Sequence, residues 1–506
     1  MVGLWWALAC APAPEPDPLD VAWGVLQAQR PHLHASEAAL GLTPDASESA
    51  VPVVPPLDGR EAGVRLAHGQ AVLDGVRREY FASIDEAAWS AAAAEALGVG
   101  TAARPEAVLD AAMAAGRPEA EVVVWGVEAA LASLDPYTRP VWPAQVAGWE
   151  QHHEGVVVGI GADLDVLVDG EVNVLSVWPA GPAFAAGLHQ GDALITIDGV
   201  EVADLGDAQA RVAGEAGSEV LLEVRREGEE AVRRLRVVRQ PVPVETVMGW
   251  VRRRGLEGAH GFDLAHPHLP GAVYLRVAAF RPDTDEALLA LVEGHDGPIE
   301  GVVLDLRGNA GGDVQAAVNV VDAWLDEGTV ATMSGRAAPL PEPPEPGVLA
   351  WNQAAPGGPF VGVPTVVLVD QGTASAAEIA AGALQELAAA HVIGAPTLGK
   401  GASQALRGDA AAGVAWQVTN LVWALPSGQV LTRGQGIVPD EALVPSLAER
   451  WQVRHQARVR SHPTVHADGS PQAWRGPTGR PELPTLAGDP GVVAALRWLR
   501  EAGDGG

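Results

Sequence analysis

The residue types with the greatest chemical potential lie close together in residues 366–404. Ser375 follows a short turn, and Lys400 and Gln404 come further along the same stretch. A serine hydroxyl is a weak nucleophile near neutral pH and needs a base to take its proton. A lysine can be that base only when it is uncharged, which requires burial among apolar groups. Lys400 stands between two glycines and has uncharged neighbours, so the sequence is compatible with a serine nucleophile and a lysine base.

Each of these residues also has a simpler explanation. Ser375 precedes an Ala-rich helix expected over residues 376–390, and Glu378 three positions later would complete a capping box. Lys400, taken alone, could be a surface amine in a loop. Gln404 follows Lys400 by four positions, so in an extended segment both side chains would share one face, and the amide could accept a hydrogen bond from the lysine.

A serine–histidine–aspartate triad is the alternative mechanism. His391 lies just past the helix that follows Ser375, and Asp305 lies on a strand that could be adjacent. A lone histidine at the end of a helix more often compensates the helix dipole. The other histidines, including His152 and His153, lack the spacing of a zinc site. We predict no metal and no cofactor.

The elements around these residues indicate an α/β core. A run of four β-branched residues and one leucine at 365–369, without polar alternation, is typical of a parallel strand covered on both faces. A strand at 273–277, a helix at 284–292 and a strand at 302–306 form a βαβ pattern. A glycine-rich turn at 307–312 and a helix at 313–325 follow; no Gly-Lys-Ser/Thr is present, so this turn is not a P-loop.

Four segments of this region together resemble the C-terminal processing (tail-specific) proteases, the S41 family of serine peptidases. They are GTASAAEIAAGAL at 372–384, TLGKG at 397–401, LDLRGNAGG at 304–312, in which Ala310 replaces the family's proline, and GQGIVPD at 434–440. The resemblance implies a crotonase-like α/β protease core and a catalytic Ser375/Lys400 dyad assisted by Gln404. The N–H of Ala376, which opens the helix after Ser375, is well placed to stabilise an oxyanion. The resemblance puts the second donor in the glycine-rich turn, at Gly311 or Gly312, and we favour Gly311.

Residues 154–240 resemble a PDZ domain, most clearly in GLHQGDALITIDG at 187–199. We expect short strands and turns around one helix. A PDZ domain captures the C-terminus of another polypeptide as an added strand, with loop N–H groups holding the carboxylate. Here that loop should comprise Val158, Gly159, Ile160 and Gly161. The resemblance therefore implies protein or peptide substrates that bind through their C-termini.

The segment in front of this region is predicted to be helical over 60–153. It closes with SLDPYT at 133–138, which resembles the element that ends the N-terminal helical domain of the same family, and we expect it to serve packing. The full predicted order is a signal-like start (1–19), a Pro/Ala-rich linker (20–59), the helical domain (60–153), the PDZ domain (154–240), the protease core (241–445) and an irregular tail with a final helix (446–506). Within the core, residues 337–359 are expected to form a Pro-rich loop, and a solvated insertion is favoured over a border of the substrate entrance.

Composition excludes several classes of protein. The formal net charge is −31, so nucleic acid, which requires a basic face, is not an expected partner. No apolar run is long enough for a membrane-spanning helix. The only cysteine is Cys10, so no internal disulfide can form. The start, MVGLWWALAC, resembles a shortened lipoprotein signal, which favours export to the periplasm or the cell envelope and leaves open whether Cys10 carries a lipid anchor.

The sequence therefore predicts an exported serine endopeptidase with an α/β multidomain fold. The competing hypothesis is a PDZ adaptor on a catalytically silent protease fold, against which the joint presence of Ser375, Lys400 and Gln404 argues.

Overall fold

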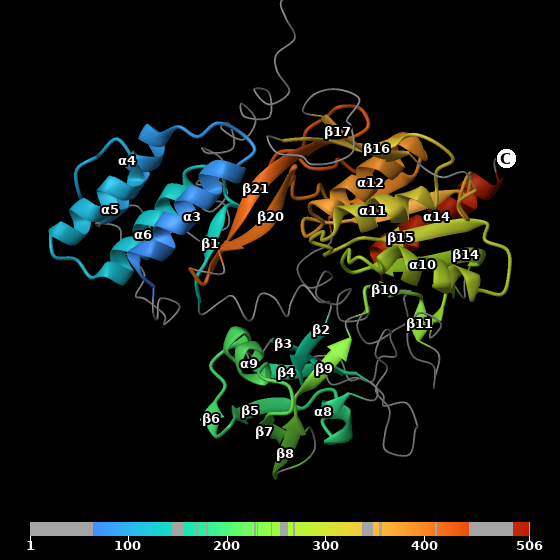
Figure 1. The fold of residues 1–506 in the computed structure, drawn as a ribbon. Coiled ribbons are helices and arrows are strands. Elements are labelled where there is room, and N and C mark those ends of the chain that lie inside the picture. Colours follow the sequence, from blue (N-terminus) through green and yellow to red (C-terminus); the bar gives the residue numbers. More distant parts are fainter. Residues whose placement is uncertain are drawn as a thin grey trace, which may run out of the picture.

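A computed structural model gives the fold of the protein (Figure 1). It describes residues 64–143, 156–166, 171–178, 181–226, 229, 231–243, 245–252, 262–266, 269–335, 348–353, 357–409, 412–444 and 489–504. The predictions for the signal-like start with Cys10, for the linker, and for most of the 446–506 tail lie outside these residues.

The first described part is a group of helices, as the sequence predicts. They are α3 (Leu66–Glu79), α4 (Glu86–Leu97), α5 (Pro105–Ala114) and α6 (Glu119–Ala132). Asp85 caps α4 by accepting hydrogen bonds from two backbone N–H groups, and Gly98 ends it in the left-handed conformation. A short strand, β1 (Arg139–Val141), then pairs with β21 (Val414–Ala424) of the core. The helical part is thus joined to the core through a shared sheet and a shared apolar cluster that includes Trp142 and Trp416.

The second part, drawn below the others in Figure 1, is a small β unit. Its elements are β2 (Val156–Gly159), β3 (Ala162–Val166), β4 (Val172–Val177), α8 (Pro182–Ala185), β5 (Ala193–Ile197), β6 (Val200–Glu201), α9 (Leu205–Val212), β7 (Glu219–Arg225), β8 (Val232–Val238) and β9 (Gln240–Pro243). The sheet order is β3-β4-β5-β7-β8, with β6 beside β5, while β2 pairs separately with β9. The described part contains a short second helix, α8, where the sequence indicated only one.

The third part is a largely parallel sheet with helices on both faces. Its strands are β10 (Val247–Met248), β13 (Ala265–His266), β14 (Leu269–Val277), β15 (Gly301–Asp305), β18 (Thr365–Val369), β19 (His391–Gly394) and β22 (Glu441–Ala442). Strands β14, β15, β18, β19 and β22 run parallel in that order. All five residues of β18 are buried, which confirms the predicted two-sided strand. A separate hairpin pairs β11 (Val251–Arg252) with β12 (Phe262–Asp263).

Side chains alternate along these strands between two apolar clusters. One cluster contains α10 (Thr284–Glu293), α11 (Val314–Asp322) and α12 (Ala376–Leu387). The other contains the final helix α14 (Pro490–Asp504). The sequence predicts a final helix with a capping Asp489 and proline at its first position, and the structure has this helix packed against the sheet.

A second sheet connects the core with the helical part. It has the order β1-β21-β16-β17, with β16 (Thr329–Ser334), β17 (Val348–Gln353), and β20 (Ala402–Asp409) beside β21. The expectation that residues 337–359 are wholly a loop is wrong, because β17 lies within them and pairs antiparallel with β16. The proline content of 337–347 concealed the apolar strand that follows it.

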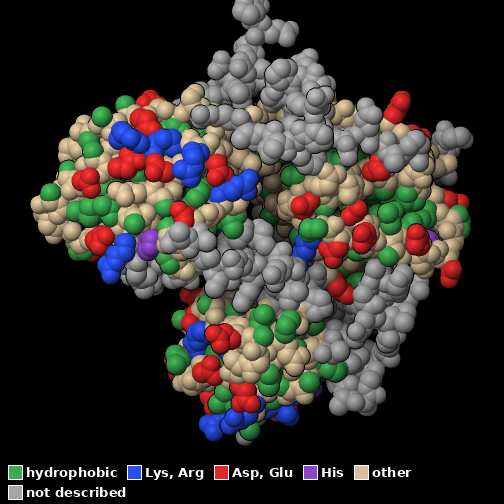
Figure 2. All heavy atoms as spheres, viewed as in Figure 1, with side chains coloured by type: hydrophobic (Ala, Val, Ile, Leu, Met, Phe, Trp, Pro, Cys, Tyr) green, Lys and Arg blue, Asp and Glu red, His purple; other side chains and the backbone are tan. Residues whose placement is uncertain are grey.

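The surface fits the acidic composition. On the face shown in Figure 2, acidic side chains are spread over all parts, and basic ones form no continuous surface. Among the described residues, no helix is both long and apolar enough to span a membrane.

Candidate active site

Ser375 lies in a tight turn between β18 and α12, at the carboxyl end of a central strand. Its φ of 56° and ψ of −122° are unusual for a residue with a side chain. Such a backbone conformation is costly, and strained turns of this kind are found where a nucleophile is held between a strand and a helix. The Asp370 carboxylate fixes the turn by accepting from the N–H groups of Gly372 and Gly308, at 2.9 and 2.8 Å. Ser375 itself is 7% exposed.

Glu378 joins the segments that carry Ser375 and Lys400. Its side chain is fully buried, and its Oε2 accepts from the backbone N–H groups of both residues, at 2.8 Å each. Its Oε1 accepts from Thr397 Oγ1 at 2.5 Å and from Gly399 N–H at 2.6 Å. The predicted capping interaction with Ser375 N–H is therefore present, but three further donors share the carboxylate. Sequence reasoning missed this role because a capping box already explained the glutamate.

Lys400 occupies a site that lowers its pKa below the ordinary lysine value. Burial is the largest effect and lowers the pKa of Lys400; Asp135 and Glu378 act in the opposite direction, and Arg139 lowers it further. The sequence indicated only uncharged neighbours, because the two carboxylates are distant in sequence. The Nζ atom lies 5.1 Å from the centroid of the Tyr137 ring.

The glycines beside Lys400 are required by close backbone contacts. A Cβ atom at Gly399 would lie 1.8 Å from the Thr432 carbonyl oxygen, and one at Gly401 would lie 2.2 Å from the Leu431 carbonyl oxygen. Neither contact is possible for a residue with a side chain. The two glycines therefore let the backbone around Lys400 lie directly against residues 431–432.

Gln404 does not make the interaction that its spacing suggested. Its amide nitrogen lies 3.3 Å from the Ala402 carbonyl and 3.3 Å from Thr419 Oγ1, and no hydrogen bond joins it to Lys400 within the described residues. The spacing argument assumed regular alternation, whereas the register of β20 against β21 shifts between Ser403 and Gln404. Such an irregularity re-aims the side chains that follow it.

The glycine-rich turn after β15 lies directly against Ser375. A Cβ atom at Gly311 would be 2.8 Å from Ser375 Cβ and 2.9 Å from Ala376 N. Asn309 holds the turn, because its carbonyl accepts from Ala374 N–H and its side-chain amide donates to the Val277 carbonyl, both at 2.9 Å. The N–H of Gly311 is occupied, since it donates to Asn309 Oδ1 at 2.8 Å.

The alternative triad of Ser375, His391 and Asp305 is not assembled. His391 begins β19 and pairs with Val366, at the end of the sheet away from Ser375. Its ring stacks on Trp498, with 4.9 Å between the ring centroids.

Asp305 is held by Arg307, Arg276 and the Tyr274 hydroxyl. Burial alone would raise the pKa of Asp305, but the two arginines hold that pKa well below its usual range. In the described part of the protein, no cluster of His, Cys, Asp or Glu has an arrangement suited to a metal ion.

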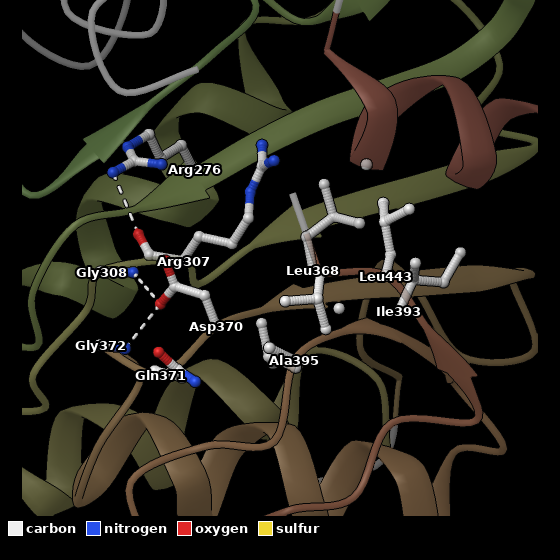
Figure 3. Close-up of a pocket in the computed structure, with 14 residues that line it drawn as sticks. Arg276, Arg307, Gly308, Leu368, Asp370, Gln371, Gly372, Ile393, Ala395 and Leu443 are labelled. Atoms are coloured by element: carbon white, nitrogen blue, oxygen red, sulfur yellow. Dashed lines mark hydrogen bonds between the residues drawn. The ribbon is translucent and has the colours of Figure 1, made fainter. Parts of the chain in front are cut away.

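Beside the turn that precedes Ser375 lies a cavity of about 240 Å³. In Figure 3, Arg276 and Arg307 lie on one side and Leu368, Ile393 and Leu443 on the other. Arg307 also reaches the first turn of α14, where its Nη1 and Nη2 donate to the Asp489 carboxylate at 2.9 Å each. The final helix is thereby fastened to the turn that abuts Ser375.

Replacing Asp489 by Asn is expected to lower the free energy of unfolding by about 2–4 kcal/mol, because the Arg307 guanidinium, whose side chain is only 12% exposed, loses one of its two carboxylates. Urea unfolding measures the effect. Asp204→Asn is the matched control, because Asp204 caps α9 through Asp207 N–H but lies in the small β unit. Equal losses in the two variants would reduce Asp489 to an ordinary helix cap.

The predicted peptide-binding loop leads from β2 into an edge strand. Ile160 is buried, and its carbonyl accepts from Ala183 N–H at 2.7 Å. Gly161 has a φ of 72° and turns the backbone into β3. Among the described strands, β3 pairs only with β4, so its other edge has no strand partner in this part of the structure.

Comparisons with known proteins agree with this architecture. Residues 271–443 match the model of peptidase family S41, and residues 158–237 match that of the PDZ domain. The protein is 32% identical over 315 residues to the carboxyl-terminal-processing protease of Picosynechococcus sp., a match that spans 61% of this sequence and 70% of that protein. It is 30% identical over 338 residues to that of Synechocystis sp., spanning 66% and 74%. A solved photosystem II D1 C-terminal processing protease is 26% identical, with a TM-score of 0.43 and coverage of 76% of this sequence and 94% of that one.

A family model covers the Ser375 and Lys400 segments, another covers the small β unit, and two relatives at or above 30% identity are matched over more than two thirds of their length. This chain belongs to the carboxyl-terminal-processing serine proteases of peptidase family S41, and it contains a PDZ domain.

Proposed function

We propose that this protease cleaves peptide bonds with a Ser375/Lys400 dyad. The observation that carries the proposal is the Glu378 carboxylate, which holds the backbone N–H groups of Ser375 and Lys400 on one oxygen atom at 2.8 Å each. The two backbone nitrogens therefore lie within twice that distance of each other. Burial lowers the pKa of Lys400, which favours the neutral amine that a base requires.

In the proposed reaction, Ser375 Oγ attacks the peptide carbonyl carbon while Lys400 Nζ takes the hydroxyl proton. Collapse of the tetrahedral intermediate breaks the C–N bond, and Lys400 returns the proton to the leaving amine. Water, deprotonated by Lys400, then attacks the acyl carbon of the acyl-enzyme. The ester bond to Ser375 Oγ breaks, the product leaves with its new C-terminal carboxyl group, and Lys400 returns the proton to Ser375 Oγ. Gln404 acts indirectly in this scheme, because its amide contacts the Thr419 hydroxyl beside the site and, in the described part of the chain, forms no hydrogen bond with Lys400.

The oxyanion would be stabilised by backbone N–H groups. Ala376 opens α12, so its N–H has no partner from within the helix. For the second donor we favour Gly312 over Gly311 in this conformation, because the Gly311 N–H already donates to Asn309 Oδ1. For Gly311 to serve, Asn309 would have to release it.

The PDZ domain would bind the substrate through its C-terminus. Support comes from the edge of β3 that pairs with no described strand, the neighbouring helix α9 and the loop Val158–Gly161 that precedes β3. An extended peptide added beside β3 would place its carboxylate near this loop. We also propose that the protein is exported, on the basis of the apolar run that ends at Cys10, with lipidation there as one form of anchoring.

Labelling with a fluorophosphonate tests the nucleophile. We expect the reagent to modify Ser375, located by peptide mass spectrometry, and to stop cleavage of casein. Ser375→Ala should abolish both labelling and cleavage. Ser427→Ala, at an exposed serine that forms hydrogen bonds with Glu386, should alter neither. If the wild-type protein shows neither labelling nor cleavage, even with added C-terminal peptides that bind the PDZ domain, the catalytically silent adaptor is the correct assignment.

A further inference from the structure

The segment SLDPYT, expected from the sequence to serve packing, contacts the proposed base. Tyr137 follows α6 of the helical part, and its ring centroid lies 5.1 Å from Lys400 Nζ. At this distance the negative face of an aromatic ring attracts a cation. The helical part therefore contributes a side chain to the site that carries Lys400.

The segment is held rigidly, so the ring is well positioned. The buried Asp135 carboxylate accepts from Tyr137 N–H at 2.7 Å, and from the N–H and the hydroxyl of Thr138 at 2.8 Å each. Thr138 Oγ1 in turn accepts from the N–H of Thr419 at 3.1 Å. Thr419 Oγ1 is the hydroxyl that the Gln404 amide approaches, so one segment supports the surroundings of both Lys400 and Gln404.

The hydroxyl group contributes little to the interaction of Tyr137 with its surroundings. The hydroxyl oxygen is buried and has no hydrogen-bond partner among the described residues. Burial raises the pKa of Tyr137 to about 12, with Arg433 acting against the rise and Asp135 and Glu378 adding to it. The side chain therefore stays uncharged near neutral pH, and its ring is the part that acts on Lys400.

The charge on Lys400 changes during the proposed reaction. The proposed base acts from its neutral form, and it becomes an ammonium ion when it takes the proton of Ser375. The charged groups that act on it are Asp135 and Glu378, which favour the ammonium ion, and Arg139, which disfavours it. An aromatic face adds attraction for the ammonium ion and, unlike a third carboxylate, carries no charge of its own.

We propose that Tyr137 is an electrostatic partner of the base, whose ring stabilises the ammonium ion formed on Lys400 in the transition state. This inference rests on the proposed Ser375/Lys400 dyad. It makes the helical part a component of the active site and not only a support for the core. It also predicts that loss of the ring moves the pKa of Lys400 in the direction opposite to the one expected if Tyr137 only excluded water.

The experiment measures kcat/KM against pH for peptide cleavage, whose acid limb reports the pKa of the base in the free enzyme. Tyr137→Leu removes the ring but keeps apolar cover, so the ammonium ion loses stabilisation. We expect the acid limb to move to lower pH by about one unit and the plateau of kcat/KM to fall about tenfold. Tyr137→Phe keeps the ring, and its limb should stay in place.

A merely structural role gives a different result. If Tyr137 only excluded water, its loss would hydrate Lys400 and move the limb to higher pH, toward the ordinary lysine value. A limb shifted upward or unchanged in Tyr137→Leu overturns the proposal. If the leucine variant does not fold, Tyr137→Met at the same position provides the test. Lys400→Ala in the same assay distinguishes failure of this proposal from failure of the dyad. Activity retained in Lys400→Ala rejects the dyad itself. Activity lost in Lys400→Ala, together with an unmoved acid limb in Tyr137→Leu, rejects only the role of the ring.

Discussion

Replacing Lys400 by alanine should reduce kcat/KM for peptide cleavage by about 10⁴-fold or more, since the serine loses the group that takes its proton. Lys400→Arg should be equally inactive, because a guanidinium keeps its proton throughout the accessible pH range. In the wild-type enzyme the rate should fall as pH falls through the lowered pKa of Lys400, because the ammonium form cannot accept a proton. A peptide with a fluorogenic scissile bond measures all three.

The lowered pKa of Lys400 also predicts how the stability of Lys400 variants depends on pH. Because the pKa of Lys400 is lower in the folded protein than in the unfolded state, the unfolded state binds more protons between these two values, and this group's contribution to stability rises with pH there. Lys400→Met should therefore melt no lower than wild type at neutral pH, and its advantage should shrink as pH rises. Cleavage retained in Lys400→Ala but lost in His391→Ala would replace the dyad with a triad.

Changing Glu378 should damage both stability and activity. Glu378→Ala leaves four buried donors without their acceptor, and we expect the free energy of unfolding to fall by about 3–5 kcal/mol. Glu378→Gln keeps the shape of the side chain, but its NH₂ group is a donor and would face the N–H or O–H donors that the carboxylate oxygen now accepts from. Since this would push the Ser375 and Lys400 segments apart, kcat should fall about 10²-fold even where the variant is folded.

Urea unfolding and single-turnover cleavage separate the two effects. Glu386→Gln is the control, because Glu386 lies on the same helix but forms exposed hydrogen bonds with Ser427. It should change unfolding by less than about 1 kcal/mol and leave kcat unaltered. A Glu378→Gln enzyme with normal kcat and normal stability would show that the shared carboxylate does not organise the site.

The core elements around Ser375 could be predicted because their signals are local. The apolar run of β18 and the helix-forming residues of α12 fixed where the turn with Ser375 must lie. The glycines beside Lys400 are also a local signal, because their backbone lies against residues 431–432 where a side chain would not fit. The motifs around these residues also identified the family.

Other features could not be predicted from neighbouring residues, and the reasons can be identified. The predicted partnership of Gln404 with Lys400 assumed an unbroken strand, and one register shift removed it. Strand β17 was hidden because its pairing partner, β16, lies across a proline-rich segment. Neither a register shift nor a long-range strand pairing has a reliable signal in the residues next to it.

The sequence by itself determined which residues could react and which elements carry them. Only the tertiary structure decided their surroundings. It brought the Tyr137 ring to Lys400, placed Asp489 on Arg307 and turned Glu378 from a helix cap into the acceptor that joins two segments. The physical reason is that burial sets the pKa of Lys400, and burial is produced by residues distant in sequence whose approach no local pattern encodes.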